Sequence, residues 1–287
     1  MSLNGGDALR LAIPNKGRLA EPALALLRDA GLEIEVSARS LTASARNHPL
    51  DLLFVRAEDV PEYVADGLVD VGLTGLDLVA ERAPQLDVIL ELGFGACTLA
   101  LAVPSAGPMT SVADLAGCRI ATAFPNLTER FLADADVEAQ VITVRGAVEV
   151  TPQLGVSDAV VDLVASGSTL RLNGLHPIAT LLESQAVLVT RGKGAHHGAS
   201  RLVEMLSSVL EARGKEYVMM NAPASALEQI RSIIPGLSGP TVMPLADPAM
   251  IAVHSVVERS TLWQLIPALK AVGAHDILVL PIERVVR

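Results

Sequence analysis

The sequence predicts an α/β fold followed by a separate C-terminal βαββαβ unit. Short apolar segments of strand character alternate with segments of helical periodicity along the first part of the chain, which is typical of a sheet covered by helices. A long helical stretch, about Gly198 to Arg213, comes next. From Lys215 onward the expected order changes to βαββαβ, the ferredoxin-like arrangement of many small ligand-sensing modules.

The opening segment predicts a strand, a polar turn and a helix. Leu9 to Ile13 has the composition of a short buried strand, and Leu19 to Leu27 has apolar residues at helical spacing. The same pattern recurs in strand 51–55 with helix 58–66, strand 69–73 with helix 76–82, and strand 119–123 with helix 127–134.

The C-terminal segment predicts four strands and two helices. In order these are strand 217–220, helix 225–233, strand 241–244, strand 251–257, helix 262–272 and strand 277–281. Because compact units fold around their own core, we expect about 70 residues here to form a domain of their own.

Composition limits the classes of function. A chain of 287 residues can form two domains or three. A net charge of −10, with only four phenylalanines, two tyrosines and one tryptophan, opposes nucleic-acid binding, which needs a basic surface and stacking platforms. No apolar run is long enough to cross a membrane and the start has no secretion signal, so we expect a soluble, cytoplasmic protein. Cys97 and Cys118 are expected to be buried small hydrophobes.

Residues Ser166, Gly167, Ser168 and Thr169 follow an apolar segment that carries Asp158 and Asp162. Such a loop at a helix start offers hydroxyl and N–H groups to an anion, although an isolated string of this kind is more often a capped turn. The two acids favour a sugar phosphate, because carboxylates accept hydrogen bonds from ribose hydroxyls. The combination suggests a ribose 5-phosphate pocket.

Cations follow two of the expected strands. Lys16 and Arg18 lie on the first strand-to-helix turn, and Arg56 follows the strand 51–55. The carboxyl ends of strands in an open α/β sheet are where ligands bind, so these side chains could hold phosphates, or they could be solvated. Glu149 could be exposed on a helix or could contact a sugar hydroxyl.

Other chemistries lack their motifs. The six histidines are scattered, without a His-Glu-x-x-His pair or a Cys/His cluster, so no zinc site is expected. The sequence also lacks a Gly-x-Ser-x-Gly elbow and a Walker-type loop, which argues against serine hydrolases and P-loop enzymes.

Several segments resemble the long form of ATP phosphoribosyltransferase, the first enzyme of histidine biosynthesis. The resemblance is most specific in 146–175, GAVEVTPQLGVSDAVVDLVASGSTLRLNGL, and covers nearly the whole chain. The other matching segments are 12–19, 69–75, 119–127, 217–223 and 277–283. One local departure is Ser166-Gly167, where many relatives have Thr-Gly, a change that keeps the hydroxyl.

The resemblance implies transfer of the phosphoribosyl group of phosphoribosyl pyrophosphate to N1 of ATP, with Mg²⁺ and release of pyrophosphate. It also implies a homo-oligomer, a hexamer built of dimers, and feedback inhibition by histidine. The catalytic core would be wound like a periplasmic binding protein, with domains at 1–99 and 180–213, at 100–179, and an ACT-like regulatory domain at 214–287.

The resemblance also implies roles for individual residues. Asp158, Asp162 and the loop 166–169 would hold the ribose and its 5-phosphate. Lys16, Arg18 and Arg56 would neutralise pyrophosphate or ATP phosphates, and Asp70 and Glu149 would line the same cleft. Asn221, Thr241 and Ala274 would contact histidine. No covalent nucleophile, general base or protein ligand to Mg²⁺ is assigned, because positioning and electrostatics suffice and Mg²⁺ is held largely by substrate oxygens.

Three other hypotheses remain open. A solute-binding protein would share the two-lobed winding but should carry a secretion signal. A type I phosphoribosyltransferase would share an acid-rich loop but would lack the βαββαβ unit. A non-catalytic regulator of the same family should have degraded ligand loops, whereas the loop here is intact.

Overall fold

The computed structural model describes residues 8–36, 40–165, 167–192, 197–234, 236 and 239–286. They form two compact units, Met1–Val203 and Glu204–Arg287. Both mix helices and strands, so the predicted α/β class is confirmed. Among the described residues no helix is both long and apolar enough to cross a membrane.

The first unit begins with a six-stranded sheet in the order β2-β3-β1-β4-β11-β5. Strand β1 pairs in parallel with both β3 and β4, so the carboxyl ends of these three strands lie at one edge. The strands are β1 (Leu9–Pro14), β2 (Thr42–Ser44), β3 (Leu50–Val55), β4 (Val71–Gly75), β5 (Asp87–Glu91) and β11 (Ala186–Thr190).

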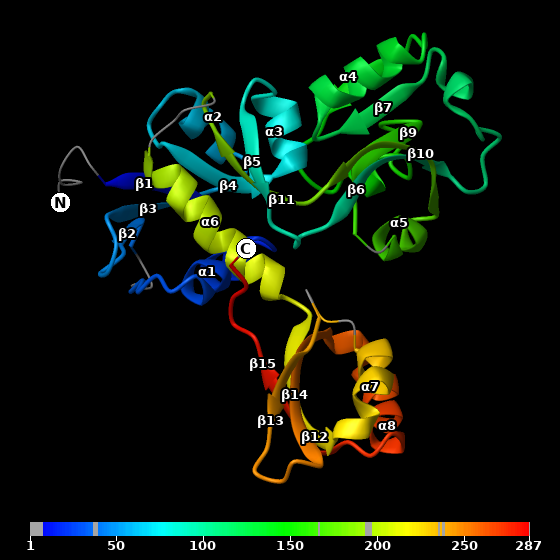
Figure 1. Ribbon diagram of the computed structural model, residues 1–287. Coiled ribbons are helices and arrows are strands. Elements are labelled where there is room, and N and C mark those ends of the chain that lie inside the picture. Colours follow the sequence, from blue (N-terminus) through cyan, green and yellow to red (C-terminus); the bar gives the residue numbers. More distant parts are fainter. Residues whose placement is uncertain are drawn as a thin grey trace. The chain divides into compact units, whose positions relative to one another are not determined.

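Helices cover both faces of this sheet. The helices are α1 (Ala20–Asp29), α2 (Val60–Ala65) and α3 (Leu76–Arg82). Side chains alternate along a strand, and Ala12 packs with Val60 and Val64 of α2 in one core cluster. Figure 1 shows α2 and α3 on one side of the sheet and α1 on the other.

A five-stranded sheet in the order β10-β6-β9-β7-β8 forms the second lobe of the same unit. Strand β9 lies at its centre, antiparallel to β6 and parallel to β7. The elements of this lobe are β6 (Cys97–Pro104), η1 (Val112–Leu115), β7 (Arg119–Thr122), α4 (Pro125–Asp134), β8 (Gln140–Thr143), η2 (Val148–Val150), β9 (Ala159–Val164), α5 (Ser168–Leu172) and β10 (Leu175–Ser184).

The chain crosses between the lobes twice, from β5 to β6 and from β10 back to β11. This confirms the two-lobed winding expected for the core. The crossings lie at residues 91–97 and 184–186, so the expected boundaries after 99 and before 180 fall inside β6 and β10.

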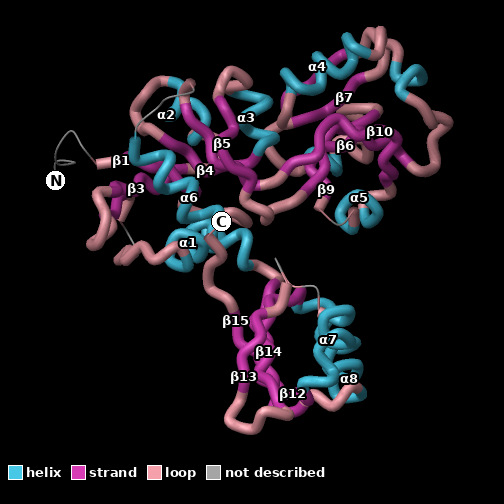
Figure 2. The backbone as a smooth tube through the Cα atoms, viewed as in Figure 1, coloured by secondary structure: helices cyan, strands magenta, loops and turns pink. Residues whose placement is uncertain are grey.

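The second unit contains the predicted βαββαβ order. Its sheet has the antiparallel order β13-β14-β12-β15, and Figure 2 shows α7 and α8 together on one face of it. The core between them includes Val218, Met220, Ile230, Val253 and Leu269. The elements are β12 (Lys215–Pro223), η3 (Ala224–Ala226), α7 (Leu227–Ile233), β13 (Thr241–Pro244), β14 (Met250–Glu258), η4 (Arg259–Thr261), α8 (Leu262–Ala271) and β15 (His275–Pro281).

The boundary of the second unit differs from the expected residue 214. The contacts within each compact unit place the division between the two units after Val203, within helix α6 (His197–Ala212). The C-terminal part of α6 therefore belongs with the sheet that follows it.

Candidate active site

The end of strand β9 is surrounded by elements that share one core cluster. Val160 of β9 packs with Val148 of η2, Leu170 of α5 and Leu175 of β10, all at most 4% exposed. Val164, the last residue of β9, packs against the same cluster. Burial of these side chains fixes the positions of η2 and α5 relative to β9, because a tightly packed core does not accommodate other arrangements. The residues adjacent to Val148 and Leu170 are thereby held near the carboxyl end of β9.

The loop after β9 makes a sharp turn at Gly167, whose φ of 72° places it in the left-handed region. Glycine adopts this conformation without a steric penalty. Ser168 and Thr169 follow as the exposed first residues of α5. Ser166 lies outside the described residues. The described part of the loop thus presents two hydroxyl side chains to solvent beside a tight glycine turn.

Arg171 was not among the predicted site residues, yet it reaches this loop. A Cβ atom built on Gly167 would lie 3.3 Å from Nη1 of Arg171. The guanidinium therefore lies against the turn and adds a positive charge beside the hydroxyls. The sequence signal was its spacing, since a residue four positions after Gly167 returns to the same side of a helix.

Two acids, Asp162 and Glu149, lie close to each other beside the loop. Burial is the main cause of a raised pKa at Asp162; the N–H of Leu163, which donates to Oδ1 at 2.8 Å, opposes it, and the charge of Glu149 raises the pKa further. A half-buried acid next to a second acid is costly to ionise unless a donor or cation reaches it. This pair can accept hydrogen bonds from sugar hydroxyls or lie near a bound cation.

The three predicted cations lie at the carboxyl edge of the first sheet. The N–H of Asn15 donates to the carbonyl of Val55 at 2.7 Å, which joins the turn that carries Lys16 to the end of β3. Arg56 follows directly and approaches Glu58 at 3.5 Å, with 64% of its side chain exposed. Lys16, Arg18 and Arg56 are thus on one sheet edge, as the strand ends predicted.

Arg18 also contacts the second lobe. Its Nη2 donates to Sγ of Cys97 at 2.8 Å. Cys97 is buried as predicted, whereas Cys118, for which burial was also predicted, is only partly buried. The next residue, Thr98, pairs with Val164 at the end of β9. A cation of the first lobe therefore lies beside the strand that leads into the hydroxyl loop.

A cavity of about 570 Å³ adjoins these residues. Its lining comes from both lobes and from the two crossings: Leu76, Glu91, Ala96, Cys97, Thr98, Val164, Ala165, Glu183, Ser184 and Gln185. Its volume is within the range of small-ligand sites. The structure thus gives open space at the junction where Arg18 meets the end of β9.

Asp158 does not belong to this group, which corrects its predicted role as a ribose ligand. It precedes β9, whereas the loop follows β9, and six extended residues separate the two ends by roughly 20 Å. Its carboxylate instead binds Arg119, with Nη2 at 3.0 Å and the backbone N–H at 2.8 Å. The guanidinium lowers the pKa of Asp158 by direct hydrogen bonding.

Asp70 requires the same correction. It lies just before β4, at the amino edge of the first sheet, and not at the edge that carries Lys16 and Arg56. Its carboxylate accepts from Nη2 of Arg10 at 2.9 Å and from the backbone N–H of Arg10 at 2.8 Å. Asp70 therefore ties β4 to β1 and does not line the cleft.

Comparison with known proteins assigns this arrangement to a family. The family model of ATP phosphoribosyltransferase (HisG) matches residues 56–212. The family model of the HisG C-terminal domain matches residues 212–284. The ATP phosphoribosyltransferase of Gemmatimonas aurantiaca is 46% identical and that of Methanosarcina acetivorans 43%. The first alignment covers 97% of this chain and 99% of the relative, and the second covers 96% and 99%. The chain belongs to the ATP phosphoribosyltransferase family.

A solved structure supports the same assignment. The ATP phosphoribosyl transferase (HisG:HisZ) complex from Thermotoga maritima contains a chain that is 29% identical, with a TM-score of 0.61. The match covers 69% of this chain and 96% of that chain. Family membership over nearly the whole chain makes it a transferase of histidine biosynthesis, and the solute-binding and type I hypotheses are set aside.

The two lobes of the first unit are joined by buried polar contacts that sequence reasoning missed. The carboxylate of Glu81, at the end of α3, accepts the backbone N–H groups of Asn126 at 3.0 Å and Leu127 at 2.9 Å. Glu81 is 7% exposed and caps the first turn of α4 from another element. A cap supplied from so far along the chain leaves no local sequence signal.

The candidate histidine contacts lie on different sides of the C-terminal sheet. Asn221 lies on the face away from the helices, because its neighbours Met220 and Ala222 belong to the core. Thr241 pairs with His254, which also faces away from the core. Ala274, in contrast, is buried in that core at 4% exposure, so its methyl group is not available to a ligand.

The site fits Mg²⁺ only together with substrate oxygens. Within the described ranges, no group of three or more His, Cys, Asp or Glu side chains could enclose a metal ion. Asp162 and Glu149 supply two carboxylates, and Mg²⁺ commonly uses one or two of these with substrate phosphates.

Proposed function

We propose that this chain transfers the phosphoribosyl group of phosphoribosyl pyrophosphate to N1 of ATP and releases pyrophosphate. The observation that carries the proposal is the grouping at the end of β9. There the hydroxyl loop, the acid pair and the guanidinium of Arg171 meet around one strand end. A sugar phosphate needs these donors, acceptors and positive charge within a few ångströms of each other.

Each part of the site would act on a different part of the donor. Gly167, Ser168 and Thr169 would bind the 5-phosphate with hydroxyl and backbone groups, and Arg171 would neutralise its charge. Asp162 and Glu149 would accept the ribose hydroxyls. As the anomeric bond breaks, the ring becomes positive, and two nearby carboxylates would stabilise that charge.

The first lobe would serve the phosphates of pyrophosphate and ATP. Lys16, Arg18 and Arg56 lie at one sheet edge, and the contact of Arg18 with Cys97 brings this cation next to β9. Negative charge grows on the leaving pyrophosphate, so fixed cations would favour its departure. Mg²⁺, when bound by the phosphates and Asp162 or Glu149, would neutralise charge on the leaving group.

A general base is not needed for the first bond. Adenine N1 has a lone pair, so it can attack the anomeric carbon once the two substrates are aligned. Catalysis would then come from alignment and electrostatic stabilisation, in agreement with the absence of a nucleophile motif in the sequence.

Regulation and assembly complete the proposal. The C-terminal unit would bind histidine as feedback inhibitor, with Asn221 and Thr241 as side-chain contacts and Ala274 through its backbone. The enzyme would assemble as a hexamer built of dimers and act in the cytoplasm. Light scattering would give the assembly state, and Thr241→Val should reduce histidine sensitivity without changing the uninhibited rate.

The test of the reaction uses purified protein with ATP, phosphoribosyl pyrophosphate and Mg²⁺. Formation of the N1 adduct changes the ultraviolet absorbance of the adenine, and mass spectrometry identifies the product. Pyrophosphate should appear in equal amount. Hydrolysis of either substrate without the adduct would refute the proposed transfer.

A further inference from the structure

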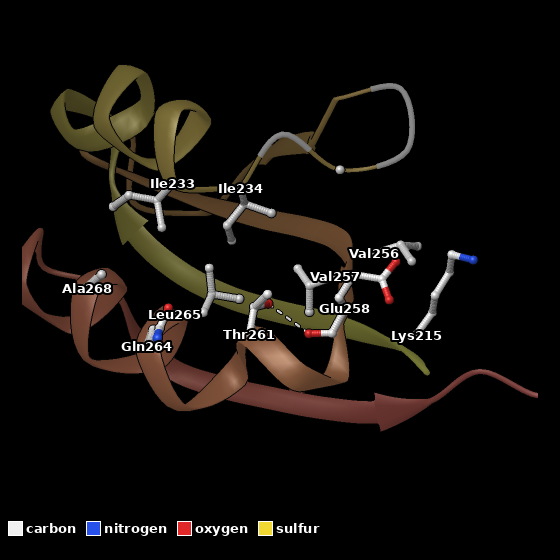
Figure 3. Close-up of a pocket in the computed structure, with 11 residues that line it drawn as sticks. Lys215, Ile233, Ile234, Val256, Val257, Glu258, Thr261, Gln264, Leu265 and Ala268 are labelled. Atoms are coloured by element: carbon white, nitrogen blue, oxygen red, sulfur yellow. Dashed lines mark hydrogen bonds between the residues drawn. The ribbon is translucent and has the colours of Figure 1, made fainter. Parts of the chain in front are cut away.

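The C-terminal unit contains a second cavity, which lies on the helix side of its sheet. Its volume is about 440 Å³, within the range of small-ligand sites. Figure 3 shows Leu265 of α8 and Ile234 of the segment after α7 facing its middle, with Val257 of β14 beside them. These apolar walls would bury the apolar part of a ligand.

Charged groups gather at one end of this cavity. Lys215 and Glu258 are partners in the β12–β14 ladder, and Figure 3 shows both at the same end. Across the residues that the structure covers, the carboxylate of Glu258 makes no hydrogen bond or ion pair. The ammonium of Lys215 bonds to the carbonyl and to the carboxylate of Glu211, which leaves one of its three donors.

A buried hydroxyl next to the cavity also lacks a partner. Oγ of Ser255 finds no hydrogen bond within the described ranges, although Ser255 is only 4% exposed. A Cβ atom on Gly236, which lines the cavity, would lie 2.7 Å from this oxygen. Buried hydroxyls normally have a partner, and this one lies behind the turn at Gly236, which forms the cavity wall. The hydroxyl is therefore enclosed beneath the wall and does not line the cavity.

We propose that this cavity binds a free α-amino acid with an apolar side chain. The ammonium group would reach Glu258, the carboxylate would reach the remaining donor of Lys215, and the side chain would fill the space between Ile234 and Leu265. A molecule without the ammonium would leave Glu258 without a partner, and a molecule without the carboxylate would leave the remaining donor of Lys215 unused. This site is separate from Asn221 and Thr241, which lie on the opposite face of the sheet.

Direct binding tests the proposal without any assay of catalysis. Trp263 is the single tryptophan of the chain, is 91% exposed and precedes Gln264 at the cavity, so its fluorescence can report occupancy. Leucine, isoleucine and phenylalanine would be titrated with fluorescence and calorimetry on the full-length protein. At least one should bind saturably. For leucine, 3-methylbutylamine and 4-methylpentanoate should bind at least about tenfold more weakly, because each has lost one charge-assisted contact.

Variants separate the site from a general surface effect. Glu258→Gln removes the charge, and Ala268→Leu fills the cavity while keeping a good helix former, so each should weaken binding by at least about tenfold. Glu228→Gln, on an exposed α7 ion pair, should bind like the wild type. Absence of binding up to about 10 mM would overturn the proposal. So would unchanged binding in both cavity variants, or displacement by histidine.

Discussion

The guanidinium and backbone N–H of Arg119 both bind the carboxylate of Asp158, while the N–H of Asp158 donates to the carbonyl of Arg119 at 2.8 Å. Arg10 and Asp70 repeat the arrangement in the first lobe, where the N–H of Asp70 donates to the carbonyl of Arg10 at 3.0 Å. Each pair joins the amino ends of neighbouring strands. These ends lie at the edge of the sheet opposite to the edge that carries the candidate ligand-binding groups.

Asp158→Asn should therefore affect stability more than catalysis. Both side chains are about two-fifths exposed, so we expect a loss of about 1 kcal/mol and a Tm lower by roughly 2–4 °C. Turnover should stay within about twofold of wild type, because the residue does not reach substrate. Thermal melts and steady-state rates check both effects. A collapse of turnover with an unchanged Tm would return Asp158 to the active site.

The pH dependence of this variant follows from its lowered pKa. The pairing with Arg119 stabilises the fold above the ordinary pKa of an aspartate, and this stabilisation is lost as pH falls through the lower folded-state pKa. The Tm difference between wild type and Asp158→Asn should shrink in that acidic range. A difference that stays constant would contradict the ion-pair explanation.

Asp162→Asn should have the opposite effects to Asp158→Asn: it should lower activity without lowering stability. Burial and the charge of Glu149 raise the pKa of Asp162, so the folded protein becomes less stable as pH rises through that pKa. At neutral pH the variant should melt at or above the wild-type temperature. Its kcat/KM should fall by at least about 100-fold, because one carboxylate no longer stabilises the ring. Near-normal kcat/KM would remove Asp162 from the site.

Arg171→Gln should weaken binding of phosphoribosyl pyrophosphate. Its guanidinium lies against Gly167, so the loss of one charged contact should raise KM by about tenfold. Arg130→Gln, on the exposed face of α4, is the matched control and should leave KM unchanged. Thr169→Ala should raise the KM for phosphoribosyl pyrophosphate as Arg171→Gln does, and it should lower kcat more than Arg171→Gln. Equal KM values for Arg130→Gln and Arg171→Gln would refute the assignment.

Glu81→Gln should loosen the junction between the lobes. The glutamine keeps one acceptor, but its NH₂ group would face the N–H groups of α4, and we expect a loss of about 2 kcal/mol. Glu62→Gln, which breaks the exposed pair with Arg82, should cost less than about 1 kcal/mol. Thermal melts of the two variants give the comparison. Similar losses of stability in the two variants would show that Glu81 contributes no more than an exposed ion pair.

Much of the fold followed from local patterns. The alternation of apolar strands and amphipathic helices predicted both the α/β core and the βαββαβ unit, because these periods depend on which side of each element is buried. The exact crossings at β6 and β10 did not follow, since strand ends depend on partners far along the chain.

The candidate site was predicted only in part. The position of Asp158 before its strand already indicated the amino edge of the sheet, so its correction rests on a signal that was present in the sequence. The expected strand 69–73 included Asp70, so its place just before β4 needed the structure. Arg171 had a helical spacing signal, whereas the contact between Glu81 and α4 joins residues 45 apart and needed the structure. Pairing between distant side chains is not encoded in any local pattern.

The most direct test of the account measures binding of phosphoribosyl pyrophosphate, with Mg²⁺, by calorimetry to wild type, Asp162→Asn and Asp158→Asn. The site at the end of β9 predicts that Asp158→Asn binds like wild type and Asp162→Asn binds at least about tenfold more weakly. Loss of binding in Asp158→Asn together with full affinity in Asp162→Asn would contradict it.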